Sequence, residues 1–217
     1  MRNARPSEMR HHESDSKTHY TVILAILAVI ALLLTACVTG QDMLQDRRTL
    51  ANSIAAKADM SPVRLDAGRF TLQGYARINA SDSGDAVLYI EGDGQAYRTY
   101  SRPSVNPTPT DPVGLRLAAQ DVSAANVIYL ARPCHYTPQW NQPDCPTRFW
   151  TSHRFAPVVI EGYMAALDKL KTRHNIGKFH LNGYSGGGAI VALLGARRDD
   201  IASLRTIAGN LDHKRIN

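Results

Sequence analysis

Residues 178–194 read KFHLNGYSGGGAIVALL, and this stretch decides the fold. A short run of strand-forming residues leads into Gly183-Tyr184-Ser185-Gly186-Gly187, and the apolar residues after it suit a helix. This order is typical of a nucleophile elbow, a sharp turn that exposes a serine hydroxyl at the end of a sheet. Gly183 and Gly187 omit the Cβ atoms that would collide in so tight a turn. The stretch therefore predicts Ser185 as a nucleophile, with the N–H of Gly186 facing a developing oxyanion.

The same glycine-rich turn has two other interpretations. A turn between a strand and a helix can bind phosphate at the helix N-terminus. Gly183 and Gly188 have the G-x-x-x-x-G spacing of a P-loop, but Ala189 and Ile190 stand where that loop needs Lys and then Ser or Thr. The dinucleotide-binding spacing G-x-G-x-x-G is absent as well. A purely structural turn is the remaining alternative.

Length and composition limit the class of protein. The chain has 217 residues, which suits one domain with a leader. Its 44% hydrophobic and 20% charged residues are ordinary for a globular protein. The net charge is +6, but the basic residues are scattered instead of forming a stripe with aromatic side chains. We therefore expect no nucleic-acid partner.

The first part of the chain has the pattern of an export signal. Residues 20–36 contain no charged side chain and follow a polar segment with four basic residues. They end in Leu34-Thr35-Ala36-Cys37, where small residues precede a cysteine. A basic segment, an apolar stretch and small residues form a secretory leader.

The end of this leader resembles a bacterial lipobox, which implies that Cys37 is lipidated and becomes the first mature residue. We expect a signal peptide over residues 1–36 and attachment to membrane lipid in a bacterial cell envelope, facing the periplasm. Val38 after the cysteine favours the outer membrane over the inner one. Two alternatives stay open, an uncleaved N-terminal membrane anchor at the short end for a transmembrane helix and an incidental buried thiol at Cys37.

The other two cysteines agree with an exported protein. Cys134 and Cys145 form an even pair in a stretch rich in Pro, Asn and Gln. They predict a disulfide that closes a short loop and stabilises the fold by about 2–3 kcal/mol. His135 beside Cys134 raises the alternative of a metal site, but neither C-x-x-C nor a second His at ligand spacing is present. We expect no metal.

Beyond Cys37, strand-like and helix-like segments alternate. Residues 37–63 are expected to form a tether with a helix over 41–60, which either lies against the domain or serves as a stalk. Residues 102–112 contain four prolines, so no regular structure is expected there. Strands are expected at 70–78, 86–90, 126–131, 179–181 and 204–208, with helices opening at Asp111-Pro112, at Pro157 and after Ser185. Such alternation predicts an α/β fold with a mostly parallel sheet, helices on both faces, and functional residues at the carboxyl ends of the strands.

A family resemblance rests on the elbow and on an earlier loop, Glu91-Gly92-Asp93-Gly94. Through both, the chain resembles the α/β-hydrolase superfamily over residues 64–217. It is similar, more narrowly, to exported bacterial lipoprotein hydrolases through segments 106–109, 131–134 and 209–213. The resemblance implies hydrolysis of a small ester or amide through an acyl-serine intermediate, with no cofactor.

The resemblance also assigns a role to the earlier loop. It implies that the N–H of the Asp93 region is the second oxyanion donor, although Glu91 stands where His is common in the family. Two glycines and an Asp suit any tight turn, so a plain turn is the alternative for this loop.

The proton-transfer residues are the incomplete part of this prediction. A serine nucleophile needs a base and an acid that orients the base, in the superfamily order Ser, Asp or Glu, His. After Ser185, Asp212 could fill the place of the acid. The only later histidine is His213, which directly follows Asp212 and lies 28 residues after the serine. No catalytic histidine is therefore identified.

Three upstream histidines, His135, His153 and His180, do not have the superfamily order and are interpreted as surface or loop residues. We favour a C-terminally truncated domain, because a parallel sheet that ends just after its central strand leaves an uncovered edge and apolar surface. The leading hypothesis is a lipid-anchored serine hydrolase of the cell envelope, whose truncated form can be inactive. The alternative is a non-catalytic envelope lipoprotein that uses the fold for binding or structure.

Overall fold

The computed structural model describes residues 19–31, 45–79, 84–137 and 145–212. The chain divides into two compact units, Met1–Met43 and Leu44–Asn217. Residues 19–31 of the first unit are helical. Within the described residues, no helix has both the length and the apolar character needed to cross a membrane. Cys37 and the lipobox lie outside the described residues, so their predicted roles stay predictions.

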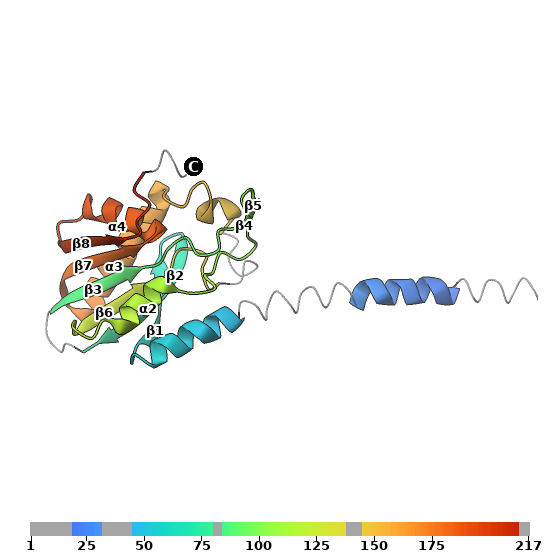
Figure 1. Cartoon of the computed structure of the whole chain (residues 1–217), viewed down its shortest axis with the longest axis horizontal. Coiled ribbons are helices and arrows are strands. Elements are labelled where there is room, and N and C mark those ends of the chain that lie inside the picture. The colour runs from blue at the N-terminus through green and yellow to red at the C-terminus, as the bar shows by residue number, and fades with distance from the viewer. Residues whose placement is uncertain (1–18, 32–44, 80–83, 138–144, 213–217) are drawn as a thin grey trace, which may run out of the picture. The chain divides into compact units, whose positions relative to one another are not determined.

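A six-stranded sheet in the order β1-β2-β6-β3-β7-β8 forms the centre of the second unit (Figure 1). β2 pairs antiparallel with β1 and with β6, whereas β6, β3, β7 and β8 all run parallel. The predicted α/β class with a mostly parallel sheet is confirmed. The strands are β1 (Ser61–Ala67), β2 (Phe70–Ile78), β3 (Gly84–Ile90), β6 (Asn126–Leu130), β7 (Ile176–Tyr184) and β8 (Ile201–Ile207).

The sequence located five of these six strands, with β2 at its predicted bounds. β1 was not predicted, because Ser61-Pro62 was interpreted only as the end of a helix. The expectation of no regular structure over residues 102–112 is wrong at its start, where β5 (Arg102–Pro103) pairs with β4 (Tyr97–Thr99). β1 lies at the edge of its sheet and β5 in a two-stranded ribbon. An edge strand tolerates proline because its missing N–H can face solvent.

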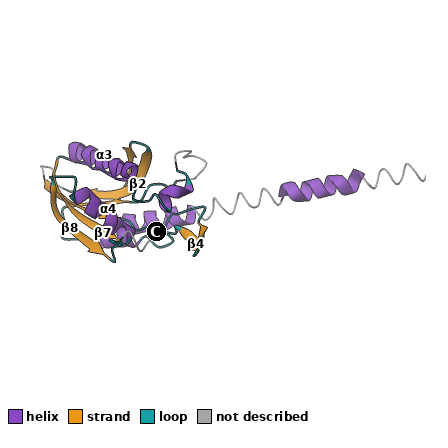
Figure 2. Cartoon of the chain, turned by 90° about the horizontal axis from the view of Figure 1, so that it is seen from above, coloured by secondary structure: helices purple, strands orange, loops and turns teal. Residues whose placement is uncertain are grey.

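Helices cover both faces of the sheet. α3 (Pro157–His174) and α4 (Gly186–Gly195) lie on one face, and Figure 2 shows α3 along it. α2 (Val113–Gln120) and a helix over residues 45–56 lie on the other. Successive residues of β6 divide between the two cores, since Ile128 packs under α3 and α4 and Tyr129 packs with α2. This alternation is the normal consequence of a strand with both faces buried.

The helix over residues 45–56 packs against the domain and does not form a separate stalk. Ala51 is fully buried in the core shared with α2. The buried Arg47 guanidinium donates hydrogen bonds to the Thr108 carbonyl at 2.6 Å and to Gln95 Oε1 at 2.6 Å. Of the two alternatives that the sequence left open for this segment, the docked one holds.

Candidate active site

Ser185 lies on the turn between β7 and α4, with φ 48° and ψ −118°. A residue other than glycine rarely adopts a positive φ, so this backbone is strained. The turn is held from β8 and its following loop, because the Ser185 N–H donates to the Ile207 carbonyl at 2.8 Å and the Ser185 carbonyl accepts from Asn210 N–H at 3.1 Å. The strand, serine and helix predicted from residues 178–194 are therefore present in that order.

The glycines around Ser185 allow close approach of backbone. A Cβ on Gly183 would collide with the carbonyl of Gly187. A Cβ on Gly187 would in turn collide with the carbonyl of Ile90, the last residue of β3. These contacts bring the elbow directly against the carboxyl end of β3, where the Glu91-Gly92-Asp93-Gly94 loop begins.

The loop after β3 and the elbow are in contact. A Cβ on Gly92 would lie 3.2 Å from the Ser185 Cβ, and a Cβ on Gly186 would collide with the Asp93 carboxylate. Among the hydrogen bonds of the described residues, none uses the N–H of Asp93. The two residues predicted as oxyanion donors, Gly186 and Asp93, are thus neighbours in space beside Ser185.

Two buried arginines hold the Asp93 side chain. Arg132 Nη1 donates to Asp93 Oδ1 at 2.8 Å, and Arg154 Nε lies 3.4 Å from Asp93 Oδ2. Arg132 also donates from Nη2 to the Arg154 carbonyl at 2.7 Å. The two guanidinium groups lie 5.4 Å and 4.9 Å from the centre of the Phe155 ring. With one carboxylate and two guanidinium groups, this cluster carries a net charge of +1.

Sequence reasoning did not find either arginine. Arg132 is two residues beyond β6, and Arg154 lies between the 3₁₀ helix η2 (Thr147–Trp150) and α3. Both side chains are buried, at 4% and 5% exposure. This burial results from the meeting of two distant segments, so the local sequence does not reveal it. One local signal was present, because Arg132 falls within residues 131–134, a segment on which the family resemblance rests.

Glu91, also in this loop, is a buried carboxyl group with three hydrogen bonds. Its Oε1 accepts from the N–H groups of Gly92 at 2.9 Å and Gly114 at 3.1 Å, and its Oε2 accepts from the Tyr129 hydroxyl at 3.1 Å. Burial raises the pKa of Glu91 and outweighs these hydrogen bonds, which act in the opposite direction. The Tyr136 hydroxyl lies near the Tyr129 hydroxyl and contributes to the raised pKa of Tyr129, but the two groups are not aligned for a hydrogen bond.

The hydrogen bond to Gly114 corrects the predicted start of α2. The sequence predicted Asp111 as the N-cap and Pro112 as the first helical residue, but Pro112 is the N-cap and offers no side-chain cap. The Glu91 carboxylate satisfies the free N–H of Gly114 in the first turn instead. This contact gives a physical reason for Glu at a position where the family commonly has His.

A pocket of about 580 Å³ opens in front of Ser185. Its volume suits a small molecule, and its lining includes a few charged residues. It is lined by residues 91–97, Pro109, Thr110, Asp111, Val113, Arg154, Tyr184 and Ser185.

The predicted acid lies on the segment after β8. Asn210 bonds to the backbone of Ser185, and Asp212 follows two residues later with an exposed side chain. His213 lies outside the described residues. The structure thus brings the chain segment of Asp212 to the elbow, where Asp212 also has an interaction partner.

The three upstream histidines do not contact Ser185 in the described part of the chain. His153 is exposed and lies 2.8 Å from the Ser152 hydroxyl. His180 Nδ1 lies 2.8 Å from Ser203 Oγ, on a neighbouring strand. His135 belongs to a loop, as expected, but its ring is fully buried next to the backbone of Asp93 and makes no well-aligned hydrogen bond. Burial and the charge of Arg132 lower the pKa of His135 to about 3.

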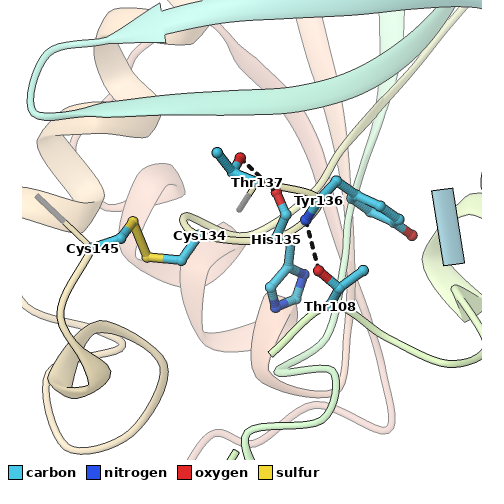
Figure 3. Close-up of a disulfide and its surroundings, with 6 residues drawn as sticks. All are labelled: Thr108, Cys134, His135, Tyr136, Thr137 and Cys145. Atoms are coloured by element: carbon cyan, nitrogen blue, oxygen red, sulfur yellow. Dashed lines mark hydrogen bonds between the residues drawn. A yellow bond between two sulfur atoms is a disulfide. The ribbon is translucent and has the colours of Figure 1, made fainter. Parts of the chain in front are cut away.

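The predicted disulfide between Cys134 and Cys145 is present, with 5.7 Å between the Cα atoms (Figure 3). The loop around it is tied to the segment just before the pocket-lining residue Pro109, since the Tyr136 N–H donates to Thr108 Oγ1 at 2.7 Å. Figure 3 shows the His135 and Tyr136 side chains pointing away from the disulfide. The described residues contain no group of three or more His, Cys, Asp or Glu arranged to hold a metal ion.

Neither protein-family models nor curated proteins give a match to this sequence. Among solved structures, it is similar to Atu1826, a putative α/β hydrolase of unknown function from Agrobacterium tumefaciens, with a TM-score of 0.50 and 14% identity over 69% of this chain and 60% of that one. The fold is that of an α/β hydrolase. The predicted superfamily fold is confirmed at this level.

Two esterases also resemble this α/β hydrolase fold. Est1E from Butyrivibrio proteoclasticus has a TM-score of 0.46 and 16% identity, covering 71% of this chain and 54% of that one. EstE1, a thermostable carboxylesterase cloned from a metagenomic library, has a TM-score of 0.47 and 16% identity, covering 78% and 54%. The chain therefore spans between 54% and 60% of the length of these three structures.

Proposed function

We propose that this protein is a serine hydrolase that cleaves an ester or amide bond of a small molecule through an acyl-enzyme on Ser185. The observation that carries the proposal is the strained φ of 48° at Ser185, on an elbow that faces a pocket of about 580 Å³. Strained backbone of this kind gathers at active sites, where the fold holds a reactive group in place.

In this proposal Ser185 Oγ attacks the substrate carbonyl carbon and gives its proton to a base. The carbonyl oxygen becomes an oxyanion, which accepts hydrogen bonds from the N–H groups of Gly186 and Asp93. Collapse of this intermediate breaks the bond to the leaving group, which takes the proton back from the base. Water then attacks the acyl-serine, and the acid product leaves. The net positive charge of the Asp93, Arg132 and Arg154 cluster favours the negative intermediate.

The proposal places the base outside the described residues. Asp212 would orient it, in the Ser, Asp, His order of the superfamily. The base is then either His213 or a histidine in a longer form of the protein, of which this chain would be a truncated product.

We place the hydrolase in the bacterial cell envelope, attached to membrane lipid through acylated Cys37 and facing the periplasm, at the outer membrane. The leader pattern of residues 1–36 and the disulfide between Cys134 and Cys145 support this location. An uncleaved anchor over the apolar residues 20–36 is the competing attachment. Incorporation of an alkyne-labelled fatty acid that is lost in Cys37→Ser distinguishes lipidation from an uncleaved anchor.

A fluorophosphonate probe tests the nucleophile. Wild-type protein should be labelled, Ser185→Ala should not, and Ser203→Ala should be labelled like the wild type. Ser203 is a suitable control because its hydroxyl also lies next to a histidine, at 2.8 Å from His180, but on β8 and away from the pocket lining. Equal labelling of Ser185→Ala and the wild type would contradict the proposal.

The second candidate function is a non-catalytic envelope lipoprotein that uses this fold for binding or structure. It is favoured by the lack of a histidine at Ser185 among the described residues. Folded wild-type protein that no probe labels would support it. The gene sequence after codon 217 then distinguishes the two candidates. A continued reading frame that adds a late histidine and restores labelling would favour the enzyme.

A further inference from the structure

We propose that Asp93 is a positioning residue, whose carboxylate, clamped between Arg132 and Arg154, holds the Asp93 N–H in register with the N–H of Gly186. The inference rests on the proposed serine hydrolase function. It attributes the relative position of the two oxyanion donors to the ion-pair cluster of Asp93, Arg132 and Arg154. The charged side chain of Asp93 acts on the reaction through the backbone that carries it.

The Asp93 side chain is in contact with the start of α4. The Asp93 carboxylate fills the space in which a side chain on Gly186 would begin. Gly186 is the first residue of α4 and directly follows Ser185. A carboxylate seated against this Cα fixes how far the loop after β3 stands from the elbow. The separation of the two N–H donors depends on the same distance, and oxyanion donors act only when they are held in place in advance.

The two arginines that hold the Asp93 carboxylate are buried and are themselves held in place. Arg132 and Arg154 are 4% and 5% exposed and the Asp93 side chain is 19% exposed, so their contacts are largely shielded from water. Each arginine is also held by backbone, since Arg132 donates to the Arg154 carbonyl at 2.7 Å and Arg154 donates to the Thr151 carbonyl at 2.7 Å. The clamp is therefore rigid independently of Asp93. Removing the carboxylate would leave two buried positive charges with a weaker partner, which strongly disfavours the present loop conformation.

A neutral variant of Asp93 separates two effects, the positioning of the Asp93 N–H and the electrostatic effect of the Asp93 carboxylate. A carboxylate next to a developing oxyanion repels it, so on charge alone the loss of the Asp93 charge should speed the reaction. The neutral and nearly isosteric change Asp93→Asn therefore gives opposite results under the two accounts. Positioning predicts a slower reaction, and electrostatics alone predicts a faster one.

The test uses the full chain and a fluorophosphonate probe, with p-nitrophenyl acetate as the ester. In Asp93→Asn, the second-order rate constant for labelling of Ser185 should fall by roughly 10- to 100-fold, somewhat less than the loss of a complete oxyanion donor. The value of kcat should fall with it, while KM stays within about twofold, because the interaction is made mainly in the transition state. Arg154→Lys keeps the charge but loses the planar guanidinium, and a smaller loss of roughly threefold to tenfold is expected.

Asp200→Asn is the matched control. Asp200 is also buried, at 8% exposure, and is also held by two cations, Arg198 at 2.8 Å and Lys171 at 2.7 Å. It directly precedes β8, whereas Ser185 follows the far end of β7. Loss of this carboxylate should lower stability without changing the labelling rate, so it separates general destabilisation from positioning.

A second readout does not depend on activity. Hydrogen exchange is measured by mass spectrometry on peptides that cover residues 91–95, whose N–H groups at Glu91, Gly92 and Gln95 are hydrogen bonded. Exchange should accelerate in Asp93→Asn and stay unchanged in Asp200→Asn. If the wild type is not labelled at all, labelling gives no readout, and the exchange result alone supports or overturns the positioning role. Labelling in Asp93→Asn that matches or exceeds the wild type, or unchanged exchange, overturns the inference.

Discussion

The Glu91 carboxylate caps α2 by accepting the N–H of Gly114 at 3.1 Å. The approach is close, since a Cβ on Gly114 would lie 3.2 Å from the Glu91 Cα. This contact joins the loop that lines the candidate active site to the first turn of α2, whose first residue, Val113, also lines the pocket. One buried carboxyl group therefore connects two segments of the pocket lining.

The first prediction concerns this carboxyl group. Glu91→Ala should lower the free energy of unfolding by about 2–4 kcal/mol, because it removes a buried side chain and leaves the N–H groups of Gly92 and Gly114 without their acceptor. Glu91→Gln keeps an acceptor oxygen and should cost about 1 kcal/mol or less. Urea unfolding measures both. Asp111→Ala is the control, since Asp111 pairs with exposed Arg116 and does not cap α2.

The pH dependence of the same variants follows from the raised pKa of Glu91. A carboxyl group whose pKa is raised on folding adds stability below its unfolded value of about 4.5, and that stability is lost as pH rises through the folded value. The wild type should therefore lose this contribution toward neutral pH, and Glu91→Gln should not. Identical pH profiles for the two proteins would contradict burial of an ionisable group at this position.

The second prediction compares two glycines of α4. Gly186→Ala should abolish most labelling of Ser185, by about tenfold or more, because its Cβ would displace the Asp93 carboxylate and with it an oxyanion donor. Gly195→Ala, at the other end of α4, would approach only the Leu204 Cδ1 atom at 3.0 Å, which can move. Its labelling rate should equal that of the wild type. Full labelling of Gly186→Ala would show that the loop and the elbow are not in contact.

The third prediction concerns His135, whose burial and proximity to Arg132 lower its pKa to about 3. A histidine whose pKa is lowered on folding adds stability above its unfolded value of 6.5, and this stability is lost as pH falls below that value. The wild type should lose about 2 kcal/mol between pH 6.5 and pH 5 from this group. His135→Leu should remove that slope, whereas exposed His153→Leu should keep it. Chemical denaturation across this pH range measures the difference.

The fourth prediction tests the disulfide. The double change Cys134→Ala and Cys145→Ala should lower the free energy of unfolding by about 2–3 kcal/mol, because the short loop becomes free in the unfolded chain. Labelling of Ser185 should also slow, since Arg132 lies two residues before Cys134 and contacts Asp93 at 2.8 Å. A reducing agent should reproduce both effects in the wild type and change nothing further in the double variant. A reductant effect on the double variant would point to a different cause.

The sequence predicted those parts of the fold whose signals are local. Ser185 and its glycines could be found because each residue of the turn is restricted by its immediate neighbours. Pro157 opens α3, and Asn175 ends it with φ 49°, for equally local reasons. The disulfide followed from an even pair of cysteines in a chain with a predicted export signal. None of these predictions depends on contacts with residues far away in the sequence.

The parts that sequence reasoning missed depend on contacts between distant segments. The cap on α2 comes from Glu91, 23 residues earlier, and not from adjacent Asp111. Arg132 and Arg154 come from distant segments and meet at Asp93, where both are buried. Nothing in the pattern of a single segment shows that a charged side chain has its partner elsewhere. The sequence therefore predicted the turn at Ser185 and singled out the Glu91-Gly92-Asp93-Gly94 loop, but it did not predict the charged cluster that holds the Asp93 side chain.

The docked helix over residues 45–56 has a practical consequence for work on this protein. Arg47 binds the side chain of Gln95, and Gln95 lines the pocket beside Pro109. The helix over residues 45–56 thus supports a residue of the pocket wall from behind. A shortened soluble version that begins at Ser61 would keep every strand of the sheet and still lose this support. A version that begins at or before Leu44 would keep the site whole.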